Sequence, residues 1–341
     1  MLFSSRLSLS NLIELCRSLR HYLGAGLPIV DAFRQQANKG ALAIRPVAGR
    51  IADALEKGDS LEDALQREER FFPPMFLALA RVGEQTGMMA EIFAELEKFF
   101  LRQRTLWRQF VAQITWPVIQ FVLAIFVMAG LILIMGLIAE SRGGQPLDPL
   151  GLGLAGPTGA MIFLGVVFTI LGSLVAIYLL MKRSLSGSVA LDEFLLRLPA
   201  LGPCLRALAL TRFCMALRLT TETGMSILKA MRLSLQATGN KAFAARSGQV
   251  EGKLRRGGEL TTALATSGLF PEDFQHMMNV AEESGTLSEV LAHQTEHYHE
   301  ESARRMAALT STAGYALWLF VAIIIIVAIF RIYSFYLGQL G

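Results

Sequence analysis

Two histidines and a glutamate late in the chain have the spacing of a zinc-binding motif. Residues 293–297 read H-x-x-E-H, and on a helix His293 and His297 would share one face, where they could hold Zn²⁺ with Glu296 as the general base of a peptidase. The motif lies in a polar run before a long apolar segment, which is typical of a solvated helix face. We therefore predict no metal and no cofactor here, and a membrane-associated zinc peptidase is the alternative function.

A second pattern places a glutamate three residues before a glycine, and it occurs twice. Glu84 and Glu282 each precede a glycine that is expected to end a helix. A carboxylate near a helix C-terminus costs about 0.3–1 kcal/mol, so each glutamate needs a compensating partner. An arginine also recurs in each copy, and we expect an ion pair between Arg20 and Glu84 and its counterpart in the second copy. The alternative is that the acids contact a partner protein. The structural or partner candidates are Arg20, Glu84, Gly87, Arg218, Glu282 and Gly285.

These recurrences belong to a long internal repeat with an interval of about 198 residues. The segment Gly26–Ala32 returns as Gly224–Ala230, and Phe72-Pro73 with Phe76 returns as Phe270-Pro271 with Phe274. A repeat of this length is a whole domain rather than a solenoid unit. Capping residues, glycine breakers and helical spacing of apolar residues recur in both copies, without a useful strand pattern. The sequence therefore predicts an all-α protein with two homologous bundles of about six short helices each.

The composition indicates a chain that lies partly in lipid. Apolar residues make up 53% and charged residues 18% of the sequence, against about 45–50% and about 25% in soluble domains. Three uncharged stretches exceed the roughly 20 residues needed to cross a bilayer. They lie between Arg108 and Glu140, between Asp148 and Lys182, and between Arg305 and Arg331. The net charge of +4 is too small to indicate a nucleic-acid surface.

The repeats and the apolar stretches together predict six segments. Residues 1–110 and 182–310 form the two cytoplasmic repeats, and residues 140–158 form an extracytoplasmic loop. The transmembrane helices are expected at residues 111–139, 159–181 and 311–337. The second of these has no counterpart in the repeat, and it returns the chain to the side on which the second repeat is built.

Basic residues next to the spans set the expected orientation. The positive-inside rule counts such flanking charges most heavily, and it places both repeats in the cytoplasm. The flanking residues are Lys98, Arg102, Arg104, Arg108, Lys182, Arg183, Arg304 and Arg305. On that side the three cysteines, Cys16, Cys204 and Cys214, are expected to be free thiols. The segment from Met1 to Ser10 lacks a long apolar region, so we predict no cleaved signal peptide.

The last helix of each repeat is expected to run directly into a span. From Met89 to about Ala139, and from Leu287 to about Leu337, the only strong helix breaker is Pro117. Each would be a helix of about 50 residues, or roughly 75 Å. The alternative is a frayed junction between two separate helices.

The duplicated pattern resembles the F-domain platform proteins of bacterial type II secretion systems and type IV pilus machines. The motifs that carry the resemblance are residues 23–28, 58–61, 72–73 and 83–88, with three spans placed as above. The resemblance implies a non-enzymatic inner-membrane platform that couples a cytoplasmic hexameric ATPase to assembly of pilin-like or pseudopilin subunits. It also implies other inner-membrane assembly proteins as partners, and a homo-oligomer. Family members commonly carry several dozen residues before the first repeat, which here starts almost at Met1.

Other function classes are disfavoured by what the sequence lacks. It contains no G-x-x-x-x-G-K-[ST] phosphate loop, so the chain is not expected to supply its own ATPase. The expected span interiors hold no Asp, Glu, Lys or His, which disfavours a transporter or channel. Whether the machine serves secretion, pili or DNA uptake stays open.

Overall fold

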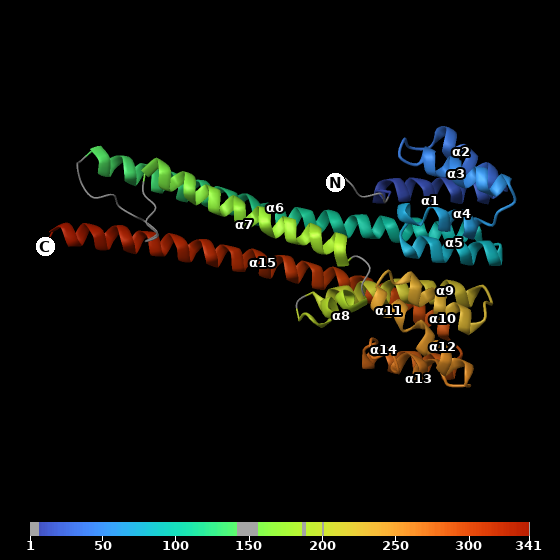
Figure 1. The fold of residues 1–341 in the computed structure, drawn as a ribbon. Helices are drawn as coiled ribbons and strands as arrows, with labels where there is room; N and C mark the ends of the chain where they lie inside the picture. The colour runs from blue at the N-terminus through green and yellow to red at the C-terminus, as the bar shows by residue number, and fades with distance from the viewer. Residues whose placement is uncertain (1–6, 142–155, 186–188, 200, 341) are drawn as a thin grey trace. The chain divides into compact units, whose positions relative to one another are not determined.

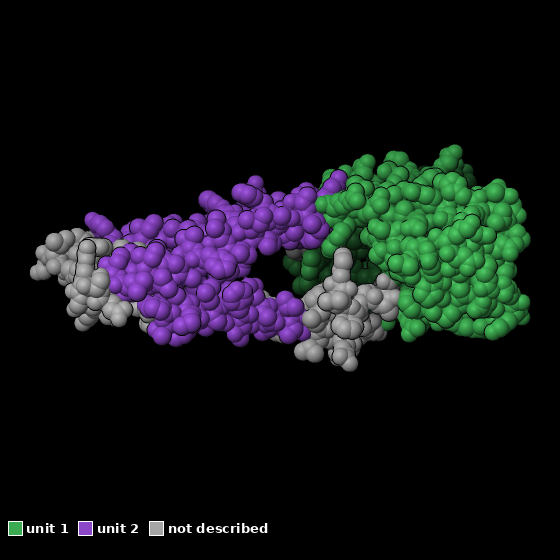
Figure 2. Space-filling model, turned by 90° about the horizontal axis from the view of Figure 1, so that it is seen from above, with its two compact units in different colours: residues 1–108, 188–305 green, residues 109–187, 306–341 purple. Residues whose placement is uncertain are grey.

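The computed structural model describes residues 7–141, 156–185, 189–199 and 201–340, and all regular elements in these ranges are helical (Figure 1). The prediction of an all-α protein is confirmed. Most of the loop expected at residues 140–158 lies outside the described residues. The chain divides into two compact units, residues 1–108 with 188–305 and residues 109–187 with 306–341 (Figure 2).

The first repeat forms a bundle of short helices that leads into one long helix. Local sequence explains the boundaries: the Ser8 hydroxyl accepts a bond from the Asn11 N–H at the start of α1, and Pro74 occupies the first turn of α5. The elements are α1 (Leu9–Gly24), α2 (Ile29–Lys39), α3 (Arg45–Glu56), α4 (Leu61–Arg67), the 3₁₀ turn η1 (Glu69–Phe71), α5 (Pro74–Thr86) and α6 (Met89–Ser141).

The second repeat follows the same order. Each α-helix of the first repeat has an equivalent in the second. In chain order, α1 to α6 correspond to α9, α10, α12, α13, α14 and α15, whereas α8 and α11 have no equivalent. The elements are α8 (Val189–Arg197), α9 (Gly202–Glu222), α10 (Ile227–Ala237), α11 (Lys241–Ala245), α12 (Ser247–Arg255), α13 (Leu260–Ala265), α14 (Glu272–Ser284) and α15 (Leu287–Leu340).

Aromatic side chains at equivalent positions occupy the centre of each bundle. Phe72 and Phe76 stack with ring centroids 4.6 Å apart, and Phe270 and Phe274 stack at 5.3 Å. The long helix of each repeat closes its own core, because α6 adds buried Phe93 to the first bundle. In the second bundle α15 adds Leu291 and Tyr298 in the same way.

The two bundles share apolar core. Helix α5 of the first repeat packs against α9 and α10 of the second. As a result, a set of second-repeat side chains belongs to the core cluster of the first bundle: Met215, Ala216, Leu219, Leu233 and Ala237.

The other unit contains the parts of the long helices that follow residues 108 and 305, together with α7 (Gly156–Leu185). By length and composition α6, α7 and α15 could each cross a membrane. The bent pair α8 and α9 also passes this test, but α9 contributes core residues to the second bundle. Where α6 and α15 approach, a Cβ added at Gly314 would lie 3.3 Å from Pro117 Cγ, so the glycine permits the close contact.

The predicted long helices are confirmed. Helix α6 contains 53 residues and α15 contains 54, and neither is divided at the end of its bundle. Pro117 lies within α6 and does not end it.

An ion pair between the second and third helices recurs in both repeats. Arg34 donates to Asp53 over 2.8 Å, and at the equivalent positions Arg232 bonds both carboxylate oxygens of Glu251. Hydrogen bonding from Arg232 lowers the pKa of Glu251 below its ordinary value, although burial acts in the opposite direction. The Glu251 side chain is 9% exposed and that of Asp53 is 57% exposed, so the second-repeat pair should contribute more to stability.

Replacing Glu251 with glutamine should lower the thermal unfolding midpoint of the detergent-purified full chain at pH 7. Since the folded-state pKa is lowered, the stabilisation is present above the ordinary carboxyl pKa and is lost as the pH falls through the lowered pKa. The gap between wild type and Glu251→Gln should therefore narrow as the pH is stepped down from 7 into the acid range. Asp53→Asn is the matched control and should have a smaller effect, because Arg34 also pairs with Glu56. A gap that widens in acid would contradict this assignment.

Candidate functional site

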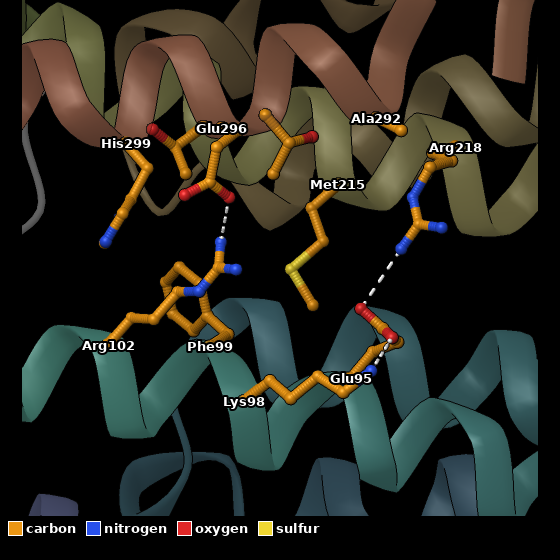
Figure 3. A pocket seen from close by; sticks show the side chains of 11 residues that line it. Glu95, Lys98, Phe99, Arg102, Met215, Arg218, Ala292, Glu296 and His299 are labelled. Atoms are coloured by element: carbon orange, nitrogen blue, oxygen red, sulfur yellow. Dashed lines mark hydrogen bonds and ion pairs between the residues drawn. The ribbon is translucent and has the colours of Figure 1, made fainter. Parts of the chain in front are cut away.

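A cavity of about 220 Å³ lies between the two bundles and is lined by charged, polar and apolar side chains (Figure 3). Helices α6, α9 and α15 supply its walls. These segments belong to the same compact unit, although they come from different repeats. The principal polar residues are Glu95, Lys98, Arg102, Arg218, Glu296 and His299.

Two ion pairs cross this cavity and connect the repeats (Figure 3). Arg218 of the second repeat donates to Glu95 of the first over 3.0 Å, and Lys98 holds the same carboxylate at 2.8 Å. Arg102 of α6 pairs with Glu296 of α15. The Arg218–Glu95 pair is half-buried, whereas the Arg102–Glu296 pair is largely exposed and should contribute less than about 1 kcal/mol.

Two of the three H-x-x-E-H residues, Glu296 and His297, make contacts with other side chains. Glu296 accepts from Arg102, and the His297 ring lies edge-on to Tyr298 with centroids 5.2 Å apart. His293 is exposed. In the described part of the chain there is no group of three or more His, Cys, Asp or Glu side chains placed to hold a metal ion. The geometry therefore offers Glu296 as an ion-pair partner between the bundles.

Glu84 caps the N-terminus of a neighbouring helix. Its two carboxylate oxygens accept from the backbone N–H groups of Leu61 at 2.6 Å and Glu62 at 2.9 Å, while the Ser60 hydroxyl accepts from the N–H of Asp63. The first N–H groups of α4, which have no partner inside the helix, are thereby satisfied. The carboxylate at the end of α5 is stabilised because it also lies at the positive end of the α4 dipole.

Glu282 makes the same contacts in the second repeat. It accepts from the N–H groups of Leu260 at 2.7 Å and Thr261 at 3.1 Å, and from the Thr261 hydroxyl. The N-cap residue of α13, Glu259, makes no side-chain capping bond. Glu282 therefore carries more of the capping of α13 than Glu84 carries for α4.

The expected pairs of Arg20 with Glu84 and of Arg218 with Glu282 are wrong. Arg20 lies 3.3 Å from Glu97, and Arg218 pairs with Glu95 and, at 3.3 Å, with Glu222. The physical reason is that each glutamate already has backbone N–H donors as its compensating partners. A role for these residues in binding a partner protein stays a prediction.

The two glycines end their helices as the pattern indicates. Gly87 has φ 75° and Gly285 has φ 70°, both in the left-handed region that side-chain-bearing residues seldom adopt. The spacing of three residues between the glutamate and the glycine thus serves two structural roles. The glycine ends the helix, and the glutamate one turn earlier reaches the start of the helix that precedes it in the chain.

Glu68, Glu97 and Glu251 are buried acids that were not anticipated from the sequence, and Glu97 is the one whose charge affects the first repeat's cysteine. Glu97 is buried on α6 and accepts from Arg17 over 2.7 Å, in addition to its ion pair with Arg20. Its burial could have been predicted from the spacing of apolar residues, since Glu97 stands four residues after Phe93 and three before Phe100, on the core-facing side of the helix. Burial, and secondarily the charge of Glu97, raises the pKa of the buried Cys16 thiol.

The three cysteines are buried free thiols in the structure: Cys16, Cys204 and Cys214. Burial raises the pKa of the Cys214 thiol as well, so both in-register cysteines are poor nucleophiles.

Comparison with known proteins gives one family for both repeats. Residues 15–137 and residues 213–335 each match the model described as type II secretion system (T2SS), protein F. The matched segments together cover more than half of the chain.

Individual relatives are similar over most of their length. The type IV pilus assembly protein PilC of Thermus thermophilus is 27% identical over 333 residues, covering 93% of this chain and 79% of the relative. PilC of Myxococcus xanthus is 25% identical, covering 88% of this chain and 73% of the relative. The type II secretion system protein F of Pseudomonas aeruginosa is 23% identical, covering 97% and 83%.

The capping role predicts unequal effects of two equivalent substitutions. Glu282→Ala should destabilise the chain by about 1–2 kcal/mol, because α13 loses its side-chain cap. Glu84→Ala should cost less, because Ser60 still caps α4. Thermal unfolding of the detergent-purified full chain would measure both, and a larger loss for Glu84→Ala would contradict the assignment.

Elemental analysis of the purified full-length chain tests the zinc motif. We expect no stoichiometric zinc, because in the described part of the chain His293 and His297 are not joined by a third His, Cys, Asp or Glu side chain placed to hold a metal ion. One zinc per chain that is lost in the His293→Ala variant would overturn this prediction and favour the peptidase.

Proposed function

Because the chain belongs to the type II secretion system protein F family, we propose that it is an inner-membrane platform protein of a type II secretion or type IV pilus machine, without catalytic activity of its own. The observation that carries this proposal is the duplicated helical bundle, in which the helix that closes each core continues into a candidate membrane span. The relatives named above belong to both kinds of machine, so the proposal covers both.

The proposed task is to couple a cytoplasmic hexameric assembly ATPase to the assembly of pilin-like or pseudopilin subunits. The bundles provide duplicated surfaces for a symmetric partner. Helices α6 and α15 provide a physical route for displacement from a bundle into the lipid, because an unbroken helix transmits movement along its axis. Other inner-membrane assembly proteins would hold the platform in place.

We infer the orientation from charge. The basic residues next to the spans place both bundles in the cytoplasm under the positive-inside rule, where an ATPase is accessible. A reporter that is active only outside the cytoplasm, inserted within residues 140–158, should be active, and the same reporter inserted after Leu42 should be inactive. Leu42 is the exposed residue of a connection between helices.

Deletion of the gene and co-purification test the proposal together. A deletion strain should fail to assemble its pilus or to secrete its product, and the full-length chain should retain the assembly ATPase of the same machine on co-purification. Normal assembly in the deletion strain would overturn the platform role. Normal ATPase retention with failed assembly would place the defect after docking.

A helix break tests transmission through α6. Thr105 is exposed on α6 before the candidate span, and Thr105→Pro removes a backbone hydrogen bond and clashes with the preceding turn, at a cost to the helix of about 3 kcal/mol. We expect the variant to bind the ATPase and to lose most of its assembled product. Thr105→Ala is the matched control and should behave as wild type. Full assembly by Thr105→Pro would show that a continuous α6 is not required.

A further inference from the structure

Helix α5 carries two sets of buried positions, and comparison with α14 separates them. Three positions are buried in both repeats and therefore face the core of their own bundle: Phe76, Ala80 and Gly83 in α5 correspond to Phe274, Met278 and Ala281 in α14. Four further positions are buried in α5, at helical spacing: Met75, Ala78, Leu79 and Val82. We refer to these four as the α5 stripe.

The α5 stripe is buried because the second repeat covers it. Helix α5 packs on α9 and α10, whose apolar side chains join the first bundle's core. Since the two bundles are otherwise built alike, the positions buried only in α5 are those that face the neighbouring bundle.

The equivalent positions of α14 are exposed: Asp273, His276, Met277 and Val280. We refer to these four as the α14 stripe. Met277 is 40% exposed and Val280 is 60% exposed, whereas Leu79 and Val82 at the same positions of α5 are fully buried. Among the described residues of this unit, no other helix covers the α14 stripe in the way that α9 and α10 cover α5.

A receiving surface is also left free on the first repeat. The five residues of α9 and α10 that join the first bundle's core correspond, in α1 and α2, to polar side chains; Ser18 and Gln35 are partly buried, and the other three are exposed. These are Arg17, His21 and Lys39, at the positions of Met215, Leu219 and Ala237. We refer to them as the α1–α2 face. Arg17 already pairs with Glu97, and Lys39 is opposite in charge to the first turn of α14, where Glu272 and Asp273 are exposed.

We propose that the α14 stripe binds the α1–α2 face of a second copy of this chain, repeating between chains the packing that joins α5 to α9 and α10 within one chain. Two different surfaces meet in such a contact, so it is heterologous and adds copies head to tail. The occupant follows from the internal register and from the opposite charges of Lys39 and the first turn of α14. The proposal does not depend on which machine the protein serves or on its coupling to an ATPase.

Paired cysteines test the contact in membranes. Two differently tagged full-length copies are co-expressed, one carrying Val280→Cys and the other His21→Cys, and mild oxidation is followed by detection of both tags. The expected result is a mixed disulfide between the two copies, with no product in wild type because its native thiols are buried. A Val280→Cys homodimer in place of the mixed product would indicate a symmetric contact and overturn the proposal. Attachment of Val280→Cys to a different protein, or no product at all, would also overturn it.

The size of the detergent-solubilised particle provides a second measurement. Val280→Asp places a charge in the α14 stripe at an exposed site, so the bundle should still fold, and the particle should become smaller. Phe194→Asp is the control, because Phe194 is 59% exposed on α8 and lies outside both surfaces. An unchanged particle in Val280→Asp, with helical circular dichroism equal to wild type, would count against the contact.

Discussion

The organisation of this chain depends on one constraint: the helix that completes each bundle is also the helix that continues into a candidate membrane span. Phe93 and Phe100 of α6 are buried in the first core, and Leu291 and Tyr298 of α15 are buried in the second. Neither helix has a break after these residues. The core of each bundle therefore contains the first part of the same helix that supplies a candidate span.

Electrostatics in the water-exposed part serves mainly to end and join helices. Glu84 and Glu282 satisfy backbone N–H groups at helix starts. The side-chain ion pairs connect elements that are distant in sequence, such as Glu95 with Arg218. Acids in the two repeats thus have structural partners that a search for catalytic groups would overlook, because a carboxylate that caps a helix resembles a catalytic carboxylate in sequence.

Much of the fold could be predicted because it is set by periodic apolar spacing and by glycine and proline positions that occur twice. The same signals located α6 and α15, and Gly87 and Gly285. The partners of Glu84 could not be predicted, because backbone donors carry no sequence signature and α4 approaches α5 only after packing. The ion pair of Arg232 with Glu251 could have been predicted from the sequence, since Arg34 and Asp53 are separated by the same interval in the first repeat. The packing of the two bundles against each other could not be predicted in this way, because the repeats differ at the positions of α5, α9 and α10 that form the contact.

That difference has a consequence for how the water-exposed part unfolds. Without the second repeat, Met75, Leu79 and Val82 of the first would face solvent, and without the first repeat, Met215, Leu219 and Leu233 of the second would do so. Loss of one bundle thus removes apolar burial from the other, at about 25 cal/mol for each Å² exposed. Although the sequence contains a duplication, the stabilities of the two bundles are coupled through this shared burial. Sequence changes tolerated in one copy are therefore limited by the stability of the other.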